Sequence, residues 1–220
     1  MKAPILAAMA AGLLIAGAAS ADSQSDRAVE VRATAECTVE QDPKSVAALL
    51  ATLPGSPDEG RVTGTLAPTY LACSSEKFVL GIGRGSQGLY NGRAHLAAAA
   101  IVDALDHGRV NMTQGGSAAP WYVGAIAGKA PIRDYDAVAL GMQEFGTCVV
   151  KAAPEASAKL VQSAAGSAEE KQARIAIAPV LAGCVAQGKP LRMNVDQLRL
   201  MIAEPLYHAI VVGRSAGQLS

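Results

Sequence analysis

The sequence predicts an all-α fold of two tandem copies of a roughly four-helix unit, each closed by one disulfide bond. A stretch bounded by cysteines occurs twice, and the four cysteines of the 220-residue chain give each copy one pair. Alanine, the residue with the highest helix propensity, is frequent throughout. Only 77–82 and 209–213 have the short apolar character of strands. Helices are therefore expected almost everywhere.

The first residues predict a signal peptide at 1–21. Lys2 precedes a run of small and apolar residues, and Ala19-Ser20-Ala21 supplies the small-x-small pattern that signal peptidase cleaves. An uncleaved anchor is the alternative, because the run is about long enough to span a bilayer. The run is rich in alanine and glycine and ends at a cleavage site, which favours cleavage. We expect a soluble periplasmic or secreted protein without stable membrane insertion after cleavage.

Composition argues against several classes of partner. The 19 lysines and arginines balance the 19 aspartates and glutamates, whereas nucleic acid requires a concentrated cationic surface. No polybasic stretch indicates binding to anionic lipids. Aromatic residues make up 4% of the chain, which disfavours the stacked surfaces that bind sugars and bases. The partner is expected to be an envelope protein or a small ligand, not nucleic acid.

The two cysteine-bounded stretches, 37–73 and 148–184, align without a gap. Beyond the second cysteine the offset shortens by ten residues, so that 101–107 corresponds to 202–208. The extra residues of the first copy fall in the glycine-rich 81–88. We interpret the alignment as an internal duplication. The matched pairs include Cys37 and Cys148, Pro43 and Pro154, Ser56 and Ser167, Glu59 and Glu170, Pro68 and Pro179, and Cys73 and Cys184.

The duplication divides the mature chain into a first helical repeat at 22–108, a linker at 109–133 and a second helical repeat at 134–220. The linker is long for a structureless connection, so it is either functional or flexible. We expect Trp121 and Tyr122, in its middle, to fill the seam between the copies rather than to bind a ligand.

Each copy is predicted to contain four helices, eight in all. The first precedes the first cysteine, and the second follows a proline, which the first helical turn tolerates. The third begins at a Ser-x-x-Glu capping box, in which Ser caps a helix amide and Glu reaches back to the Ser amide, and ends at the second cysteine. Asn91 and Asn194 are expected to cap the fourth helices. The predicted ranges are 26–37, 44–53, 56–73 and 93–107 in the first copy, and 134–148, 155–164, 167–184 and 195–212 in the second.

Three prolines lie inside these predicted helices: Pro68, Pro179 and Pro205. Proline in a helix interior removes a donor and costs roughly 3 kcal/mol. Pro68 and Pro179 occupy equivalent positions, so a kink or break shared by the two third helices is expected.

An even number of cysteines in an exported chain predicts two disulfides, for which three pairings are possible. The duplication selects Cys37–Cys73 and Cys148–Cys184. In the chain-entropy model, closing a loop of this length stabilises the folded state by roughly 4 kcal/mol per bridge. A redox pair would show Cys-x-x-Cys, and a zinc site would bring its ligands in close pairs, so neither a redox role nor a bound metal is expected.

Residues 83–88 read Gly-Arg-Gly-Ser-Gln-Gly, formally a dinucleotide-binding fingerprint. The second copy lacks these glycines, and no alternating strand–helix pattern surrounds them. A surface insertion is the preferred interpretation, and no cofactor is expected. A small anion held near Arg84 and Arg93 is the modest binding hypothesis.

The histidines and acids suggest a second set of candidates. His107 precedes Gly108 at a predicted helix end, where a cationic ring meets the negative end of the helix dipole, and His208 is its counterpart. Asp103 and Glu204 lie one turn earlier and could act with these histidines as acid and base. Structural roles are preferred, because no His-x-x-His or His-Glu-x-x-His pattern occurs.

Several short sequence motifs of the chain resemble those of a group of small exported bacterial proteins. These proteins have a duplicated cysteine-bounded helical unit and no assigned activity. The motifs are Cys148-Val149-Val150, Ala178-Pro179 and Ala203-Glu204-Pro205-Leu206-Tyr207. The resemblance covers most of the mature chain. It implies export and a helical fold, and it carries over no catalytic residue.

Two hypotheses about function follow. The preferred one is a non-enzymatic helical protein of the cell envelope that binds a partner or small ligand, or has a structural role there. The alternative is an envelope hydrolase or other enzyme whose acids and histidines converge in the fold. A cleft lined by Asp103 and His107, or by Glu204 and His208, would favour the enzyme. A filled seam with those side chains in water would favour the binding or structural protein.

Overall fold

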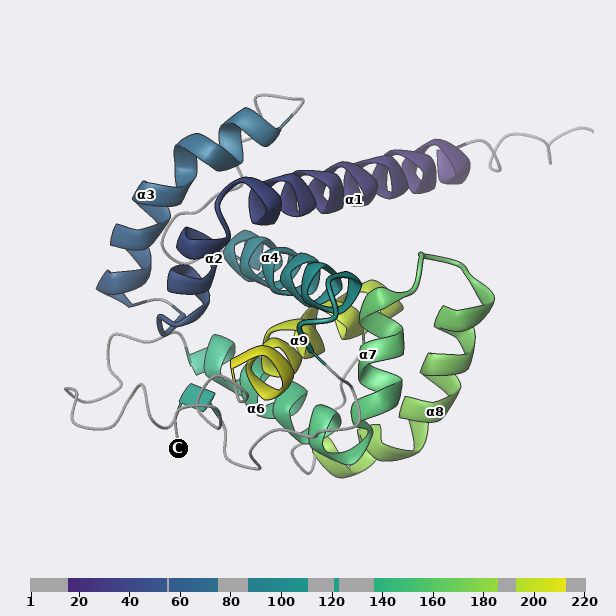
Figure 1. Ribbon diagram of the computed structural model, residues 1–220. Helices are drawn as coiled ribbons and strands as arrows, with labels where there is room; N and C mark the ends of the chain where they lie inside the picture. The colour runs from purple at the N-terminus through teal and green to yellow at the C-terminus, as the bar shows by residue number, and fades with distance from the viewer. Residues whose placement is uncertain are drawn as a thin grey trace, which may run out of the picture.

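A computed structural model describes residues 16–54, 56–74, 87–110, 121–122, 137–185 and 193–212 (Figure 1). These residues form eight named α-helices and a π-helical turn, and no strand occurs among them, which confirms the predicted all-α class. The predicted 77–82 strand candidate lies outside the described residues. The elements are α1 (Ala16–Gln41), α2 (Pro43–Leu50), α3 (Pro57–Cys73), α4 (Gln87–Asp106), α6 (Ala137–Ala152), α7 (Pro154–Gln162), α8 (Ala168–Cys184), α9 (Val195–Tyr207) and the π-helical η2 (His208–Val212).

Most helix starts follow the local sequence signals. Ser56 accepts a hydrogen bond from the Glu59 amide at 3.2 Å, and Ser167 accepts one from the Glu170 amide at 3.1 Å. Asn194 caps α9 in a reciprocal capping box with Gln197. Asn91 does not cap α4, because that helix already begins at Gln87.

One of the two contacts predicted for each Ser-x-x-Glu box, the hydrogen bond from the Ser amide to the Glu side chain, does not occur. The amides of Ser56 and Ser167 donate to the backbone oxygens of Leu53 and Ala164, at 3.1 and 3.2 Å. The carboxylate of Glu59 instead accepts from Arg93, while that of Glu170 accepts from Arg199 and, at its other oxygen, from the Gly166 amide at 2.6 Å. A cap signal fixes where a helix begins, but it does not fix where a long side chain points.

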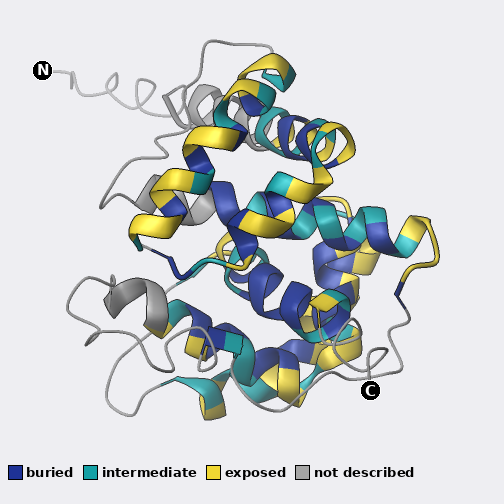
Figure 2. Ribbon diagram, turned by 60° about the vertical axis from the view of Figure 1, so that its left-hand side comes forward, coloured by how far each residue is buried: buried dark blue, intermediate teal, exposed yellow. Residues whose placement is uncertain are grey.

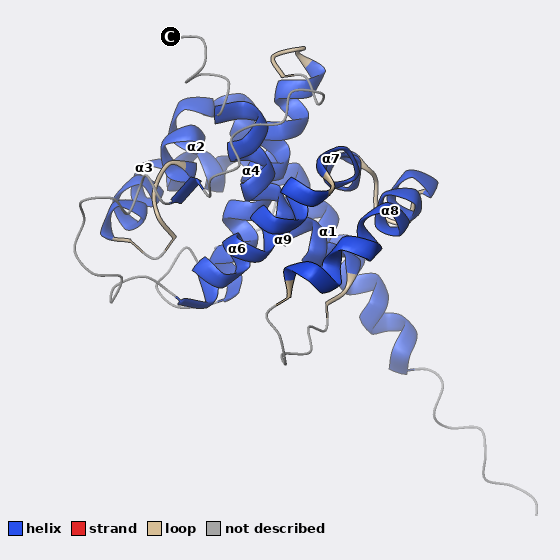
Figure 3. Cartoon of the chain, turned by 90° about the horizontal axis from the view of Figure 1, so that it is seen from below, coloured by secondary structure: helices blue, strands red, loops and turns tan. Residues whose placement is uncertain are grey.

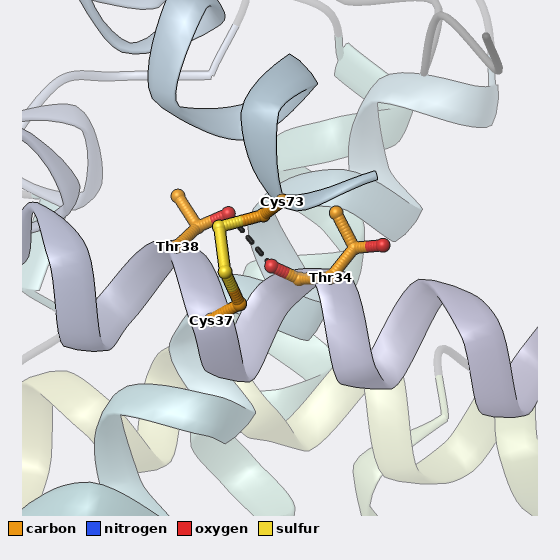
Figure 4. Close-up of a disulfide and its surroundings, with 4 residues drawn as sticks. All are labelled: Thr34, Cys37, Thr38 and Cys73. Atoms are coloured by element: carbon orange, nitrogen blue, oxygen red, sulfur yellow. Dashed lines mark hydrogen bonds between the residues drawn. A yellow bond between two sulfur atoms is a disulfide. The ribbon is translucent and has the colours of Figure 1, made fainter. Parts of the chain in front are cut away.

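Both predicted disulfides are present, and they account for all four cysteines. Cys37–Cys73 joins the last turns of α1 to the end of α3, with Cα atoms 5.7 Å apart. Figure 4 shows this bridge beside Thr34 and Thr38, whose hydroxyl donates to the Thr34 backbone oxygen at 2.7 Å. Cys148–Cys184 joins α6 to the end of α8 in the same way, at 5.6 Å.

Of the kink or break expected at Pro68 and Pro179, the break does not occur. Helices α3 and α8 continue through Pro68 and Pro179, which are both exposed. The carbonyls that these prolines leave without an amide donor belong to Gly64 and Ile175, and these residues are exposed too. Water can therefore take the place of the missing donors.

Pro205 lies in the buried part of α9, where a neighbouring helix approaches closely. The carbonyl deprived of a donor there belongs to Met201, four residues earlier. A Cβ atom added to Gly146 of α6 would overlap this Met201 oxygen and would lie 2.8 Å from Cγ of Pro205. Glycine at position 146 thus permits α6 to pack directly against the carbonyl at the proline site.

Helices α4 and α9 lie side by side in the middle of the molecule, with α1 packed on α4 and α6 packed on α9 (Figures 1 and 3). Helices α3 and α8 lie at opposite sides, each stapled by its disulfide. Dark blue buried segments concentrate along the inner helices in Figure 2. One apolar cluster includes Leu50, Leu66 and Ile101 from the first half and Leu160, Ile177, Ile202 and Leu206 from the second. Because this core crosses both halves, the division into two units stays a prediction.

Candidate functional site at the α4–α9 seam

A buried arginine of α4 is the centre of the site. The Arg93 side chain is 3% exposed, so its charge is almost fully removed from water. Its guanidinium donates to the C-terminal end of α2 and the residues beyond it, where backbone oxygens lack the amide donor four residues later that a continuing helix would supply. These acceptors are the oxygens of Leu49 at 3.0 Å, Leu50 at 3.4 Å and Thr52 at 3.0 Å, and the Thr52 hydroxyl at 3.0 Å.

Two carboxylates from distant helices complete the partners of Arg93. Glu59 of α3 accepts from Nη1 at 2.9 Å. Glu204 of α9 binds in a bidentate manner, accepting from Nη2 at one oxygen and from Nε at the other, the latter at 3.3 Å. Burial by itself would lower the pKa of Arg93, but the charges and hydrogen bonds of Glu204 and Glu59 outweigh it and raise that pKa. The arginine is therefore a permanent cation that joins α2, α3, α4 and α9.

Gln143 of α6 extends this network towards the linker. Its side chain is buried, and its Nε2 donates to Glu204 Oε2 at 2.7 Å. The amide oxygen at its other end accepts from the indole Nε1 of Trp121 at 3.1 Å. Adjacent to this contact, the Tyr122 hydroxyl donates to Glu144 at 3.2 Å. Both linker aromatics are thus held by neighbouring residues of α6.

Trp121 lies flat on His208, the first residue of η2. The ring centroids are 3.9 Å apart and the planes differ by 7°, while Tyr207 meets the same imidazole edge-on at 5.3 Å. Burial, with the charge of Arg93 as a second cause, lowers the pKa of His208 to about 3, although a hydrogen bond with the Leu50 backbone opposes the shift. The Nε2 atom of this ring is buried and has no hydrogen-bond partner among the described residues.

The second half holds a simpler version of the arginine contact. Arg199 of α9 donates to the Leu160 backbone oxygen near the end of α7 at 3.0 Å, and to Glu170 of α8 at 2.6 Å. Leu160 and Glu170 are the sequence counterparts of Leu49 and Glu59. The remaining contact of Arg199 is with Asp196, on its own helix and 61% exposed at its side chain, at 3.4 Å.

The predicted pair Asp103 and His107 lies on the surface. His107 Nδ1 is 3.1 Å from an Asp103 carboxylate oxygen, and the His107 side chain is 67% exposed. Arg109 binds the other oxygen of the same carboxylate. Glu204 and His208, by contrast, are buried at the seam. The sequence alignment made the two pairs equivalent, whereas their surroundings are opposite.

Other sequence candidates are placed only in part. Arg84 and 81–86 lie outside the described residues, as does the linker except for 109–110 and 121–122. Arg93 is in a carboxylate network rather than at a surface anion site. His95 of α4 is largely buried, and this burial, together with the charges of Arg32 and Arg199, lowers its pKa to about 4.

Glu59 was expected only in a capping box, and Gln143 was not predicted at all as a site residue. Glu59 had a usable signal, since it and Glu170 keep their positions in both copies. No local pattern marks Gln143, whose role depends on contacts with residues 22 and 61 positions away.

Within the described parts of the chain, no three His, Cys, Asp or Glu side chains lie close enough to hold a metal ion. No helix in those parts is long and apolar enough to cross a membrane. Comparison of the chain with family models, curated proteins and solved structures gives no match. The chemistry of the site therefore rests on its own geometry.

Proposed function

We propose that this chain is an exported, periplasmic or secreted, non-enzymatic binding protein of the cell envelope, with its binding site at the seam where α6 and α9 meet the linker. The main support for the proposal is that the buried charged groups are already held by hydrogen bonds to one another and to neighbouring groups. Arg93 donates to both glutamates and to the end of α2, and Glu204 also accepts from Gln143. Groups held in this way position other atoms well but have little capacity to move protons.

Three further features support the proposal. Two disulfides are typical of proteins that mature in an oxidising compartment, and 1–21 has the composition of a signal peptide. The seam is lined by aromatic and amide side chains, which commonly fix the orientation of a ligand in a binding site. The matched disulfides and matched arginine–glutamate contacts agree with the predicted duplication, which would place the site between the two copies.

Intact mass measurement of the protein purified from the periplasm tests this proposal. The denatured mass should equal that of the chain from Asp22 less four hydrogens, for cleavage after Ala21 and two disulfides. Under native conditions we expect additional mass from a bound ligand or partner. A denatured mass that retains 1–21 would contradict export with cleavage. A native mass equal to the denatured one, after gentle purification at several protein concentrations, would contradict the binding role.

One observation favours the second candidate, an envelope hydrolase. The Asp103–His107 contact has the arrangement in which a carboxylate orients a histidine that acts as general base. Hydrolysis of a chromogenic ester by wild type and His107→Gln distinguishes the candidates. A binding protein should show the same background rate for both chains, whereas a rate that falls at least tenfold in His107→Gln would favour the hydrolase.

A further inference from the structure

The contact between Trp121 and His208 has the geometry of a ligand in a binding slot. We define the aromatic slot as the face of His208, the edge of Tyr207 and the amide oxygen of Gln143. A ring lying on His208 is 3.9 Å from it and parallel within 7°, and its N–H reaches Gln143 at 3.1 Å. These three residues are supplied by α6, α9 and η2, whereas the occupant comes from the linker.

The acceptor of the slot is fixed in advance by groups that do not touch the occupant. Gln143 is 4% exposed, and its Nε2 donates to Glu204 Oε2 at 2.7 Å. Glu204 is in turn held by Arg93 through both carboxylate oxygens. Because the two ends of an amide are joined rigidly, holding its nitrogen on Glu204 keeps its oxygen directed at the ring position.

Burying this network of charges has a high desolvation cost. Burying one arginine with two carboxylates removes charges from water, and apolar residues of similar volume often stabilise a fold equally well or better. Burial lowers the pKa of His208, and the charge of Arg93 lowers it further, so the imidazole beside the network is uncharged. A neutral imidazole and an oriented amide oxygen are the recognition groups that the network produces.

Trp121 does not use all the polar capacity of the slot. In a neutral imidazole one nitrogen is a donor and the other an acceptor. Nε2 of His208 is buried and has no hydrogen-bond partner among the described residues, although buried polar atoms are nearly always paired. Nε2 lies in the plane of the ring, so only an occupant that extends past the edge of the imidazole, with a polar substituent beside the stacked ring, can complete this hydrogen bond.

We propose that the aromatic slot binds a planar heteroaromatic group carrying a ring N–H donor, and that Trp121 is an intramolecular occupant which this ligand displaces. The proposal rests on the proposed binding function and names the ligand class of that same site. Trp121 is suited to displacement because its side chain is held only by ring contacts with His208 and its neighbour Tyr122 and by one neutral hydrogen bond among the described residues. Its own side chain remains partly exposed.

The first experiment uses the full chain with Trp121→Ala and measures indole binding by titration calorimetry. Benzothiophene, which has a similar shape but no N–H, is the matched ligand. We expect indole to bind about tenfold more tightly, as one hydrogen bond to a fixed acceptor implies. Adding Gln143→Leu should remove this preference, while adding Gln162→Leu on the exposed face of α7 should keep it. Circular dichroism and the count of disulfides verify folding of each variant.

The second experiment asks whether the ligand displaces Trp121 in the wild-type chain. Trp121 is the single tryptophan, so a ¹⁵N-labelled sample has one indole N–H resonance. Unlabelled indole should move this resonance towards its position in unfolded chain, and benzothiophene should do so at about tenfold higher concentration. The wild-type affinity for indole should be lower than that of Trp121→Ala, because the tethered side chain competes.

Three results would overturn the inference. Absence of indole binding to Trp121→Ala would show that the slot is not a site, and equal binding of the two ligands would show that the amide acceptor is irrelevant. Binding to Trp121→Ala without any change in the wild-type resonance would show that Trp121 is a permanent part of the core. A native mass that includes a ligand, found beside any of these results, would retain the binding function and place its site elsewhere.

Discussion

The two arginine sites of this protein share one local plan and differ in what surrounds it. Arg93 and Arg199 each bind a backbone oxygen near the end of a short helix and a glutamate near the start of the next. Arg93 has a further buried carboxylate from the other half, whereas the additional partner of Arg199 is the surface residue Asp196. The same arginine–glutamate contact thus becomes a network of several helices where the other half of the chain adds a second buried carboxylate.

The largest difference between the sites is expected on removing the cation. Arg93→Met leaves the buried carboxylates of Glu59 and Glu204 without the guanidinium that binds both, which should lower the free energy of unfolding by about 3–5 kcal/mol. Arg199→Met removes the contacts with Glu170, Asp196 and the Leu160 backbone oxygen at a partly exposed site and should cost about 1–3 kcal/mol. Urea unfolding at pH 7 measures both values. Equal losses would mean that Glu204 adds nothing to the first site.

The helix contacts that frame the two sites also differ. Two residues before the first cysteine of each copy, α1 carries the buried Ala35 and α6 carries Gly146. Gly146→Ala would force the new Cβ onto the Met201 backbone oxygen, so we expect a loss of about 3 kcal/mol in unfolding free energy.

Gly141→Ala is the matched control on the same helix, since a Cβ there meets nothing within 4 Å. Alanine at this exposed helical position should stabilise the protein by about 0.5–1 kcal/mol. If the two substitutions changed the denaturant midpoint by similar amounts, close packing of α6 on α9 would not be the reason for glycine at 146.

Each arginine has a histidine near it whose pKa is lowered, the buried His208 near Arg93 and the partly buried His95 near Arg199. The pKa of His208 is lowered to about 3 and that of His95 to about 4, in both cases chiefly by burial and then by nearby arginines. Unfolded histidine has a pKa of about 6.5, so between pH 6.5 and 4 the unfolded chain binds more protons than the folded one. Stability should therefore fall as pH falls through this window, by about 2 kcal/mol per histidine at pH 5.

Urea unfolding between pH 7 and 4 measures this loss. His208→Phe and His95→Phe should each reduce the pH dependence of the unfolding free energy, and the double variant should reduce it further. An unchanged pH dependence in both single variants would assign the loss to other groups.

The smallest effect should be the same in both halves. Ser56→Ala and Ser167→Ala each remove the side-chain acceptor of the first turn of a helix, which costs about 1 kcal/mol. Thermal unfolding of the two variants should show similar decreases in Tm. A much larger effect at Ser56 would indicate that the start of α3 also positions Glu59 for Arg93.

The sequence allowed the helices, most caps and the disulfides to be predicted because their causes are local or repeated. Ser56 and Asn194 cap amides three residues away, and the paired cysteines keep the same separation of 36 residues in each copy. Asn91 was a wrong prediction because the turns before it already continue the helix, and no signal there is as strong as a capping box.

The site could not be predicted in the same way. Arg93 and Glu204 are separated by 111 residues, and their contact exists only because α4 and α9 pack side by side. The sequence offset that aligns Asp103 with Glu204 does not align Arg93 with Arg199, so the correspondence of the two arginines was not visible in the sequence. Arg93 follows Glu59 by 34 residues and Arg199 follows Glu170 by 29, so the contacts correspond at an offset different from that of the histidines.

The order of the two disulfides along the chain has a consequence for how such a protein matures. Each cysteine is bonded to its neighbour in the sequence: Cys37 to Cys73, and Cys148 to Cys184. A chain that enters an oxidising compartment from its N-terminus presents its cysteines in this same sequence. In such a compartment, oxidation of each pair as its second thiol emerges would yield the native set directly, and no later exchange of bonds would be needed.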